Sequence, residues 1–390
     1  MNDGHLLRRT SVVALLLAVA VVVGVARSAP TPTPVDLGTL GGSSSGAAAI
    51  SPSGQVVGQS ATAGGEEHAF SWTKAGGMID LGTLGGSSSS ATGVSPSGQV
   101  VGSSRTLPGF FDIPTHAFSW TTAGGMVDLG TLGTSDSAAV AVSSSGQVVG
   151  NSYYREFPDF STAFSWTKAG GMIGLGSLGT ASWATAVGAG GQVAGYFSTL
   201  GHTAVHAFLW TEAGGMVDLG TLDQADSTAT AVSPSGQVVG YAYTPELPIV
   251  RAFSWTATGG MVDLGVISGS FSYATAVNPS GQVVGYTAAA GNSETHAFSW
   301  TKAGGMTDLG TLGGTSSYAV AVGPSGQVVG YSSTTGGATH AFSWTKAGGM
   351  VDLGTPGGTS STAAAISSNG QIAGASDTAT GGFHATLWRR

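Results

Sequence analysis

Histidine and aspartate recur along this chain at nearly constant spacing, and both side chains can bind metal ions or transfer protons. The histidines precede a repeated Ala-Phe-Ser-Trp type segment and are His68, His116, His206, His296, His340 and His384. The aspartates begin repeated Asp-Leu-Gly segments and are Asp36, Asp80, Asp128, Asp218, Asp263, Asp308 and Asp352. A zinc ion needs three or four ligands around one centre, whereas these copies are a whole repeat apart. We therefore expect no metal site: each histidine should bond a neighbouring turn, and each aspartate should accept turn or backbone hydrogen bonds within its own repeat.

Two glycine-containing patterns resemble catalytic or cofactor motifs. Residues 42–46, Gly-Ser-Ser-Ser-Gly, match a nucleophile elbow, and residues 174–179, Gly-Leu-Gly-Ser-Leu-Gly, match a dinucleotide fingerprint. Both motifs need a strand-turn-helix context, and the sequence shows no strong helix after its N-terminal segment. With 66 glycines in 390 residues such patterns arise by chance. We predict no catalytic residue and no cofactor from them.

The elements that position these residues form a repeat whose tryptophan returns every 44 to 48 residues from Trp72 to Trp388. One unit reads as strand 91–94, a Ser-Pro-Ser-Gly turn, strand 99–103, a variable loop, strand 116–121, a Gly-Gly turn and strand 126–130. Phe118 and Trp120 alternate with Ala117 and Ser119, as expected of a half-buried strand. Four short strands joined by tight turns at this period predict an all-β fold, a β-propeller of four-stranded antiparallel blades.

The number of repeats predicts how the propeller closes. There are eight Gly-Gln second strands and eight fourth strands of the Asp-Leu-Gly type. The repeats begin with a fourth strand at Val35 and end with a third strand at Trp388. We therefore predict eight blades, with the N-terminal outer strand pairing with the C-terminal blade. The alternative is a parallel β-helix or another solenoid, whose coils are usually shorter than this period.

The same segments resemble the HAF-repeat family of probable extracellular repeat proteins. The match is His-Ala-Phe-Ser-Trp, Gly-Gly-Met-x-Asp-Leu-Gly-Thr-Leu-Gly-Gly and Ser-x-x-Gly-Gln-Val-Val-Gly, recurring in order over residues 35 to 388. The resemblance implies an exported protein built from repeats and brings no reaction or ligand. Copies depart from the pattern: Thr162 and Arg251 replace the histidine, Gly174 the aspartate and Pro356 a leucine.

The N-terminus predicts export. Arg8 and Arg9 precede an apolar run of about 16 residues, followed by small residues before a cleavage point, which is the pattern of a secretory signal peptide. We assign residues 1–28 to the signal peptide, 29–34 to a Pro/Thr spacer and 35–390 to one propeller domain. The protein should be secreted, with no membrane association after cleavage. An uncleaved N-terminal anchor is the alternative.

Composition excludes some classes of partner and bond. The chain has no cysteine, so it forms no disulfide. Only 8% of its residues are charged and its net charge is −8, which falls to −10 without residues 1–28 because three arginines and one aspartate are lost. Phosphate binding needs a basic surface, so we expect no nucleic-acid partner. The sequence leaves the oligomeric state open.

The candidate binding residues lie where the repeat pattern fails. The short turns are nearly invariant, whereas the loops and connections at the opposite ends of the strands vary and carry aromatic and charged residues. Loops on rigid scaffolds often carry function, and tyrosine, tryptophan and arginine favour recognition. The candidate ligand-binding residues are Phe111, Asp112, Tyr153, Tyr154, Arg155, Trp183 and Tyr243.

These observations lead to an expectation about function. We expect an exported, non-enzymatic scaffold that binds a glycan or a surface protein through its variable loops, centred on the second and third units. A purely structural or adhesive repeat protein is the alternative. A propeller lyase or glycosidase is a third reading, but it needs paired carboxylates, and inner strands such as residues 229–232 carry none.

Overall fold

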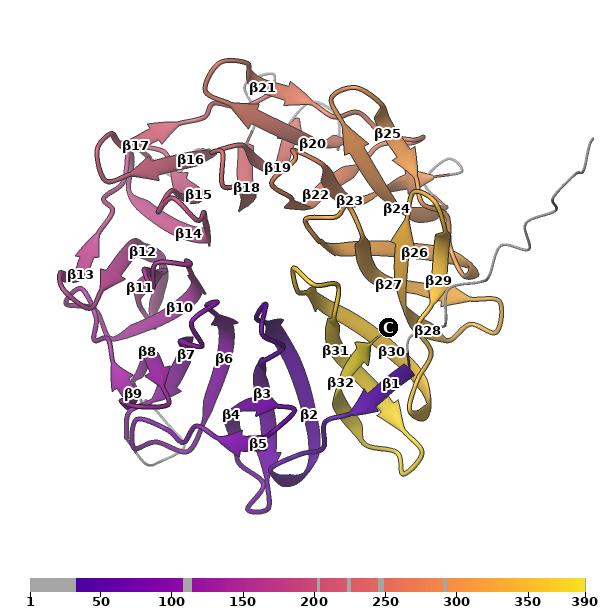
Figure 1. The fold of residues 1–390 in the computed structure, drawn as a ribbon. Helices are drawn as coiled ribbons and strands as arrows, with labels where there is room; N and C mark the ends of the chain where they lie inside the picture. Colours follow the sequence, from indigo (N-terminus) through magenta and orange to yellow (C-terminus); the bar gives the residue numbers. More distant parts are fainter. Residues whose placement is uncertain are drawn as a thin grey trace, which may run out of the picture. The chain divides into compact units, whose positions relative to one another are not determined.

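The computed structural model describes residues 33–107, 114–201, 204–222, 226–244, 249–289 and 293–389, with only the backbone described at 158, 159 and 244. Within these ranges the regular secondary structure consists of β-strands, and none of it is a helix long and apolar enough to cross a membrane. The strands pair into eight units of four, and Figure 1 shows these units following one another around a ring. The predicted propeller fold is confirmed.

We call the units blades 1 to 8, and within each blade neighbouring strands pair in antiparallel fashion in the order given. The strands are, in blade 1, β2 (Gly41–Ile50), β3 (Val56–Thr62), β4 (Glu67–Thr73) and β5 (Gly77–Asp80); in blade 2, β6 (Ser89–Val94), β7 (Val100–Arg105), β8 (Thr115–Thr121) and β9 (Gly125–Asp128); in blade 3, β10 (Asp136–Val142), β11 (Val148–Tyr154), β12 (Phe157–Thr167) and β13 (Gly171–Gly174); in blade 4, β14 (Ala181–Val187), β15 (Val193–Ser198), β16 (Val205–Thr211) and β17 (Gly215–Asp218); in blade 5, β18 (Asp226–Val232), β19 (Val238–Thr244), β20 (Ile249–Thr256) and β21 (Gly260–Asp263); in blade 6, β22 (Ser272–Val277), β23 (Val283–Ala289), β24 (Glu294–Thr301) and β25 (Gly305–Asp308); in blade 7, β26 (Gly313–Val322), β27 (Val328–Thr334), β28 (Thr339–Thr345) and β29 (Gly349–Asp352); and in blade 8, β30 (Gly357–Ile366), β31 (Ile372–Thr378), β32 (Phe383–Arg389) and β1 (Thr33–Asp36).

Glycine is required at two recurring places in each blade. Gly54 ends the first turn of blade 1 with a φ of 84°, a left-handed conformation that strains other residues. Gly58 lies in β3 where a Cβ atom would stand 1.9 Å from the carbonyl oxygen of Gly46 in β2. The two innermost strands therefore approach closely only because this side chain is absent, which explains the repeated Val-Val-Gly segment.

The core lies between blades, as the alternation of large and small residues predicts. Phe118 of blade 2 is fully buried and packs with Ala69 and Leu81 of blade 1. The equivalent phenylalanines of blades 1 to 7 are all fully buried. Blade 8 has lost this phenylalanine, and Trp388 is fully buried there against Leu353 of blade 7. Burying one such side chain contributes roughly 1.5–3 kcal/mol, so each blade is stabilised mainly by its neighbours.

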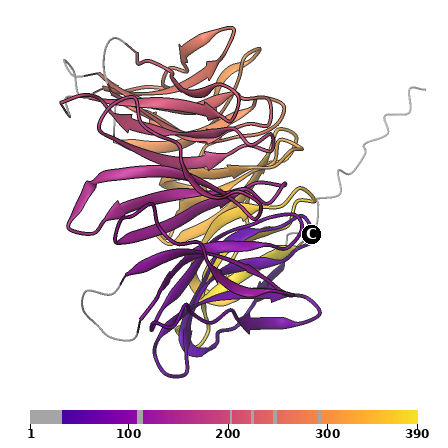
Figure 2. The same cartoon turned by 90° about the vertical axis from the view of Figure 1, so that its left-hand side faces the viewer.

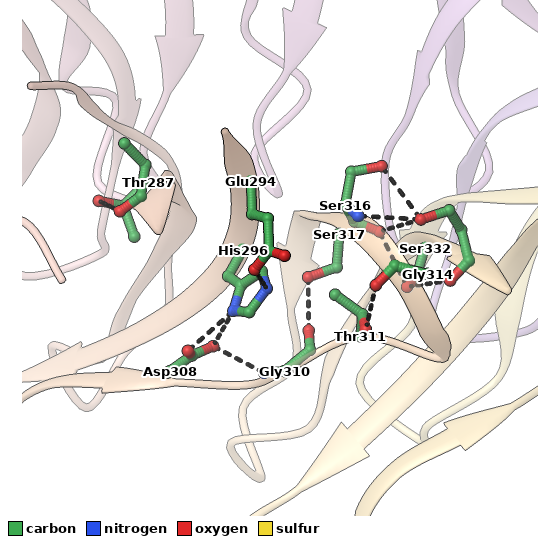
Figure 3. Close-up of polar contacts among 12 residues, drawn as sticks. Thr287, Glu294, His296, Asp308, Gly310, Thr311, Gly314, Ser316, Ser317 and Ser332 are labelled. Atoms are coloured by element: carbon green, nitrogen blue, oxygen red, sulfur yellow. Dashed lines mark hydrogen bonds and ion pairs between the residues drawn. The ribbon is translucent and has the colours of Figure 1, made fainter. Parts of the chain in front are cut away.

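A buried serine joins each blade to the one before it. Ser317 of blade 7 accepts a hydrogen bond from the Ala297 amide at 2.8 Å. It also donates to the Gly310 carbonyl at 2.6 Å (Figure 3). The equivalent serines make the same two bonds in every blade and are Ser45, Ser89, Ser137, Ser182, Ser227, Ser272, Ser317 and Ser361. The polar joints between blades are thus satisfied without charged residues.

The two ends of the described chain meet in blade 8. Strand β1 pairs with β32, with Val35 opposite Leu387, as the count of strands predicts. The Leu37 amide also donates to the Ala385 carbonyl at 2.9 Å. One correction concerns the spacer: Thr33 and Pro34, which the sequence placed in it, belong to β1, because the extended backbone that proline favours suits an edge strand.

The blades expose two different ends. The short-turn face carries the turns between first and second strands, such as Ser51–Gly54, and between third and fourth strands. The variable-loop face carries the loops between second and third strands and the connections between blades. Figure 2 views the ring from the side, so that its two faces lie to the left and the right. Tyr273 is the second residue of β22 and stands opposite Tyr286, the middle residue of β23. Both lie away from the Asn278–Gly281 turn, towards the variable-loop face.

Candidate functional site

The recurring histidines and aspartates form pairs on the outer half of the blades. In blade 6, His296 Nδ1 lies 2.8 Å from the Asp308 carboxylate, which also accepts a hydrogen bond from the Gly310 amide at 2.7 Å (Figure 3). Equivalent pairs occur in blades 1, 2, 4 and 7, and His384 pairs with Asp36 in blade 8. The aspartates thus accept turn hydrogen bonds as predicted, but the histidines bond these aspartates rather than a turn.

On the variable-loop face of blade 3, a buried carboxylate holds a hairpin in place. Asp136 accepts hydrogen bonds from the Thr115 amide at 2.9 Å and the Ser135 hydroxyl at 2.7 Å. Arg155 completes the set with an ion pair to the same carboxylate. Burial raises the pKa of Asp136, but its three hydrogen bonds and the nearby guanidinium outweigh burial and lower the pKa below the usual 3.8. This carboxylate is therefore ionised, and its oxygens are already bonded to Thr115, Ser135 and Arg155.

The hairpin beside Asp136 carries three of the predicted residues. Tyr153 and Tyr154 end β11, and the Tyr154 hydroxyl donates to the Gly133 carbonyl at 3.3 Å. Arg155 follows and is bound to Asp136. A hollow of about 320 Å³ lies here, lined by Pro114, Ser135, Tyr154, Arg155, Glu156 and Phe157. The arrangement explains Arg155 as an anchor of the hairpin.

The other predicted residues are spread over different blades. Phe111 and Asp112 lie outside the described residues. Trp183 is in β14 of blade 4, half-buried. Tyr243 is in β19 of blade 5, 41% exposed, and pairs across the sheet with Asp226 and Val250. The five candidates that the structure describes therefore lie in three different blades, 3, 4 and 5, rather than in one cluster.

A cluster that the sequence reading mostly missed runs across blades 4 to 7. We call it the aromatic row; its residues are Trp183, Tyr196, Tyr241, Tyr273, Tyr286, Tyr318 and Tyr331. All seven are half-buried and lie on the first two strands of their blades. Of these, Trp183 is among the candidate residues predicted from the sequence.

Contacts within and between blades alternate along the row. Within a blade the rings stack: the centroid distance is 5.0 Å for Trp183–Tyr196 and 5.1 Å for both Tyr273–Tyr286 and Tyr318–Tyr331. Between blades the rings meet edge to face, at 4.9 Å for Tyr241–Tyr273 and 5.1 Å for Tyr286–Tyr318. Because neighbouring rings cover the flat faces of the stacked rings, the row presents ring edges and hydroxyl groups to a ligand.

The tyrosine hydroxyls of the row are available for hydrogen bonding. Within the described part of the chain, none of the six bonds to another protein group, and none is among the buried polar atoms without a partner. Each hydroxyl therefore reaches solvent. Burial, helped by nearby phenols, raises the pKa of Tyr286 to about 12 and raises the pKa values of Tyr196, Tyr273 and Tyr331 above 10. These phenols are neutral at every physiological pH.

A hollow of about 470 Å³ opens beside the tyrosines of blades 6 and 7. It is lined by Val250, Ser270, Phe271, Tyr273, Tyr286, Thr295 and Tyr318. Val250 and Thr295 are each the second residue of a third strand, and Phe271 ends the connection into blade 6, so the hollow faces the variable-loop side. Its volume lies in the range of roughly 300–1,000 Å³ that is usual for small-molecule sites.

A signal for the row is present in the sequence. The residue after Gly in the Gln-Val-Val-Gly type segment is tyrosine in four consecutive repeats, at Tyr196, Tyr241, Tyr286 and Tyr331. In the other repeats it is Gln59, Ser103, Asn151 and Ala375. Comparing repeats column by column, rather than comparing loop lengths, would have found this position.

Comparisons with known proteins bear on the fold alone. No protein-family model and no curated protein matches the chain. Among solved structures it is similar to dipeptidyl peptidase 4 of Porphyromonas gingivalis, with a TM-score of 0.56 and 10% identity over 91% of this chain and 58% of that one. It is also similar to the propeller domain of the Trilobed protease of Pyrococcus furiosus, with a TM-score of 0.50 and 10% identity over 80% and 97%. A puromycin hydrolase mutant matches with a TM-score of 0.48 and 13% identity over 84% and 55%.

These similarities correct the functional expectation. The sequence led us to expect a non-enzymatic scaffold that binds a surface ligand through its loops. Propellers of this shape form part of a peptidase and a protease, so the fold does not support a non-enzymatic role and we abandon that expectation. At 10% identity the similarity carries no reaction from those proteins to this one. The described chain is a β-propeller.

Proposed function

We propose that the aromatic row is the ligand-binding site of this propeller and that its ligand is a neutral sugar. The observation that carries the proposal is the set of six tyrosine hydroxyls, unbonded within the described chain and gathered on four neighbouring blades. A phenol hydroxyl both donates and accepts hydrogen bonds, and a sugar hydroxyl does the same. A row of such groups matches a ligand rich in hydroxyls.

The charge of the site favours a neutral ligand over an ionic one. Burial raises the pKa values of Tyr196, Tyr273, Tyr286 and Tyr331, to about 12 for Tyr286, so these four phenols stay protonated. The chain as a whole carries a net charge of −8, which repels anions at long range. A cation would gain from carboxylates, but the lining of the hollow beside Tyr273 and Tyr286 consists of uncharged side chains. The site therefore suits a neutral polyol better than it suits an anion or a cation.

We also infer that the protein meets this ligand outside the cytoplasm. The support is the pattern of residues 1–28, with Arg8 and Arg9 before an apolar run, which is that of a secretory signal. The resemblance to HAF-repeat proteins agrees with export. Detection of the mature protein in culture medium or the cell-wall fraction would support this inference, and its confinement to the cytosol would oppose it.

The test of the sugar site compares variants of the aromatic row with a variant at the equivalent position of a blade outside the row. Tyr286→Ala with Tyr318→Ala removes two rings of the row, whereas Ser103→Ala changes the equivalent position in blade 2. Binding to an array of neutral glycans, followed by calorimetry on the best sugar, measures the affinity. We expect a loss of about 30-fold or more for the double variant, as for aromatic hot spots, and no change for Ser103→Ala.

The proposal fails if no neutral glycan binds the wild-type protein, or if the double variant binds as well as wild type while remaining folded. Circular dichroism and thermal unfolding of both variants establish that they are folded. Because alanine leaves a gap in the row, Tyr286→Phe serves as a second variant that keeps the ring and removes only the hydroxyl.

A further inference from the structure

The aromatic row repeats itself from blade to blade, and this bears on the length of its ligand. In blade 6 the stacked pair is Tyr273 with Tyr286, and in blade 7 it is Tyr318 with Tyr331. Within each pair the two tyrosines stand directly opposite each other in the ladder. The ring centroids are 5.1 Å apart in both pairs, and the interplanar angles are 24° and 27°. The row therefore presents the same pair of hydroxyls again one blade further along.

The equivalent pair of opposed positions in blade 4, at the other end of the row, is also occupied by aromatic residues. Trp183 stacks on Tyr196 in blade 4 with an interplanar angle of 17°. In blade 5 the first-strand partner is Thr228, and Tyr241 stands alone opposite it. Tyr241 contacts Tyr273 of blade 6, and Tyr286 contacts Tyr318 of blade 7. Blades 5 to 7 are thus linked by ring contacts, and blade 4 adds a further pair at the same position.

The row has two definite ends. Beyond Tyr331 the ladder position is occupied by Thr362 and Ala375 of blade 8. Before Trp183 it is occupied by Ala138 and Asn151 of blade 3. The Asn151 side chain is already engaged, since it accepts from the Ala184 amide at 2.7 Å and donates to the Ala184 carbonyl at 3.2 Å. The repeated surface therefore spans four blades.

We infer that the ligand is a linear oligosaccharide lying along blades 4 to 7, with one subsite per blade, rather than a single sugar. This inference rests on the proposed function. A polymer of identical units presents the same hydroxyls at regular intervals, as the row does. A lone sugar would need one pocket, and the tyrosines of the remaining blades would have no ligand to bind.

The experiment is a length series. Calorimetry measures the affinity of the protein for linear β-1,4-glucan, α-1,4-glucan and β-1,4-N-acetylglucosamine oligomers of one to eight units. We expect the affinity for the bound series to rise about five-fold or more with each added unit, the equivalent of one further neutral hydrogen bond, and to level off at about four or five units.

Three tyrosine-to-phenylalanine variants locate the subsites, and each keeps its ring so that the fold is preserved. Tyr286→Phe should weaken oligomers of every length by about five-fold, because it lies beside the hollow. Tyr196→Phe and Tyr331→Phe should weaken only the longest oligomers, because they lie near the two ends of the row. Ser103→Phe in blade 2 is the matched control and should change nothing.

The outcomes separate this inference from the proposal beneath it. If sugars bind but the affinity is the same for one unit and for six, the linear-ligand inference is wrong while the sugar site stands. If the end variants weaken short and long oligomers alike, the subsites do not follow the blades and the inference is again wrong. If no sugar of any length binds, both statements fall.

Discussion

Blades 4 to 7 and the four remaining blades share the same four-stranded design but differ in the residues at one pair of opposed positions on the two inner strands. In the first group the opposed residues of the two inner strands are Trp183/Tyr196, Thr228/Tyr241, Tyr273/Tyr286 and Tyr318/Tyr331. In the second group they are Gly46/Gln59, Ser90/Ser103, Ala138/Asn151 and Thr362/Ala375. Half of the ring therefore folds with no aromatic residue at the place where the other half has seven.

The rest of the scaffold does not follow this division. The buried phenylalanine recurs in blades of both groups, at Phe118 and Phe298 for example. The joining serine recurs in all eight blades, Ser89 and Ser317 included. Since residues without an aromatic ring satisfy the fold in blades 8, 1, 2 and 3, stability does not require the tyrosines of blades 4 to 7. This difference is why we assign recognition to the aromatic row and stability to the shared scaffold.

The largest effect should come from breaking the scaffold that both halves share. Deleting Val35–Leu40 removes the second half of β1, the buried Leu37 and the Asp36–His384 pair. Loss of one buried leucine costs about 2–5 kcal/mol, and the lost ladder adds to it. We expect a sharp fall in melting temperature, measured by circular dichroism. An unchanged melting temperature would show that the chain ends do not stabilise the ring.

A smaller effect should follow from releasing the hairpin of blade 3, outside the row. Arg155→Ala leaves the buried Asp136 carboxylate without its counterion. Breaking a buried pair costs several kcal/mol, but Arg155 is partly exposed and two other hydrogen bonds remain, so we expect about 1–3 kcal/mol by urea unfolding. Glu156→Ala on the same hairpin is the control. Sugar binding should be unaffected; its loss would place blade 3 in the site.

The contribution of the Asp136–Arg155 pair to stability should depend on pH. The folded pKa of Asp136 lies below 3.8, so its contribution to stability is present above pH 3.8 and is lost as the pH falls through the folded pKa. Arg155→Ala should therefore narrow the stability difference between pH 6 and pH 3. A difference as large as in wild type would mean that other carboxylates dominate acid unfolding.

A further test of the difference between the two groups of blades is to add a tyrosine to blade 8, next to the end of the aromatic row. Thr362 occupies the position of Tyr318 one blade on, and the preceding second-strand residue is Tyr331. Thr362→Tyr should meet Tyr331 edge to face, as Tyr318 meets Tyr286, a contact of about 0.5–1.5 kcal/mol. We expect a slightly higher melting temperature and tighter binding of the longest oligosaccharides only. Ser90→Tyr, away from the row, should leave binding unchanged.

The smallest effect at ordinary pH concerns the tyrosines themselves. Burial raises the pKa of Tyr286 to about 12 and raises the pKa values of Tyr273 and Tyr331 above 10. A raised folded pKa gives stability that is present below pH 10 and is lost as the pH rises towards 12. Thermal unfolding should therefore be level from pH 7 to 9 and decline above pH 10, less steeply in Tyr286→Phe. Absorbance titration of the phenols checks the pKa values directly.

Much of the architecture could be predicted from short stretches of sequence. The alternation of Phe118 and Trp120 with small residues predicted a strand with one large face, and the Ser-Pro-Ser-Gly turn predicted a hairpin. The unpaired fourth strand at Val35 predicted the pairing with β32 that the structure has. The ion pair of Arg155 could not be predicted, because its partner Asp136 comes from a different strand 19 residues away.

By itself, the sequence determined the blade, the number of blades and the meeting of the chain ends, because each depends on local periodicity repeated at a constant interval. Only the tertiary structure decided that tyrosines 45 residues apart, such as Tyr273 and Tyr318, belong to one surface. Tyr286 bridges them because it stacks on Tyr273 within blade 6 and meets Tyr318 of the next blade at 5.1 Å. That closeness comes from the packing of one blade on the next, which no spacing along the chain expresses.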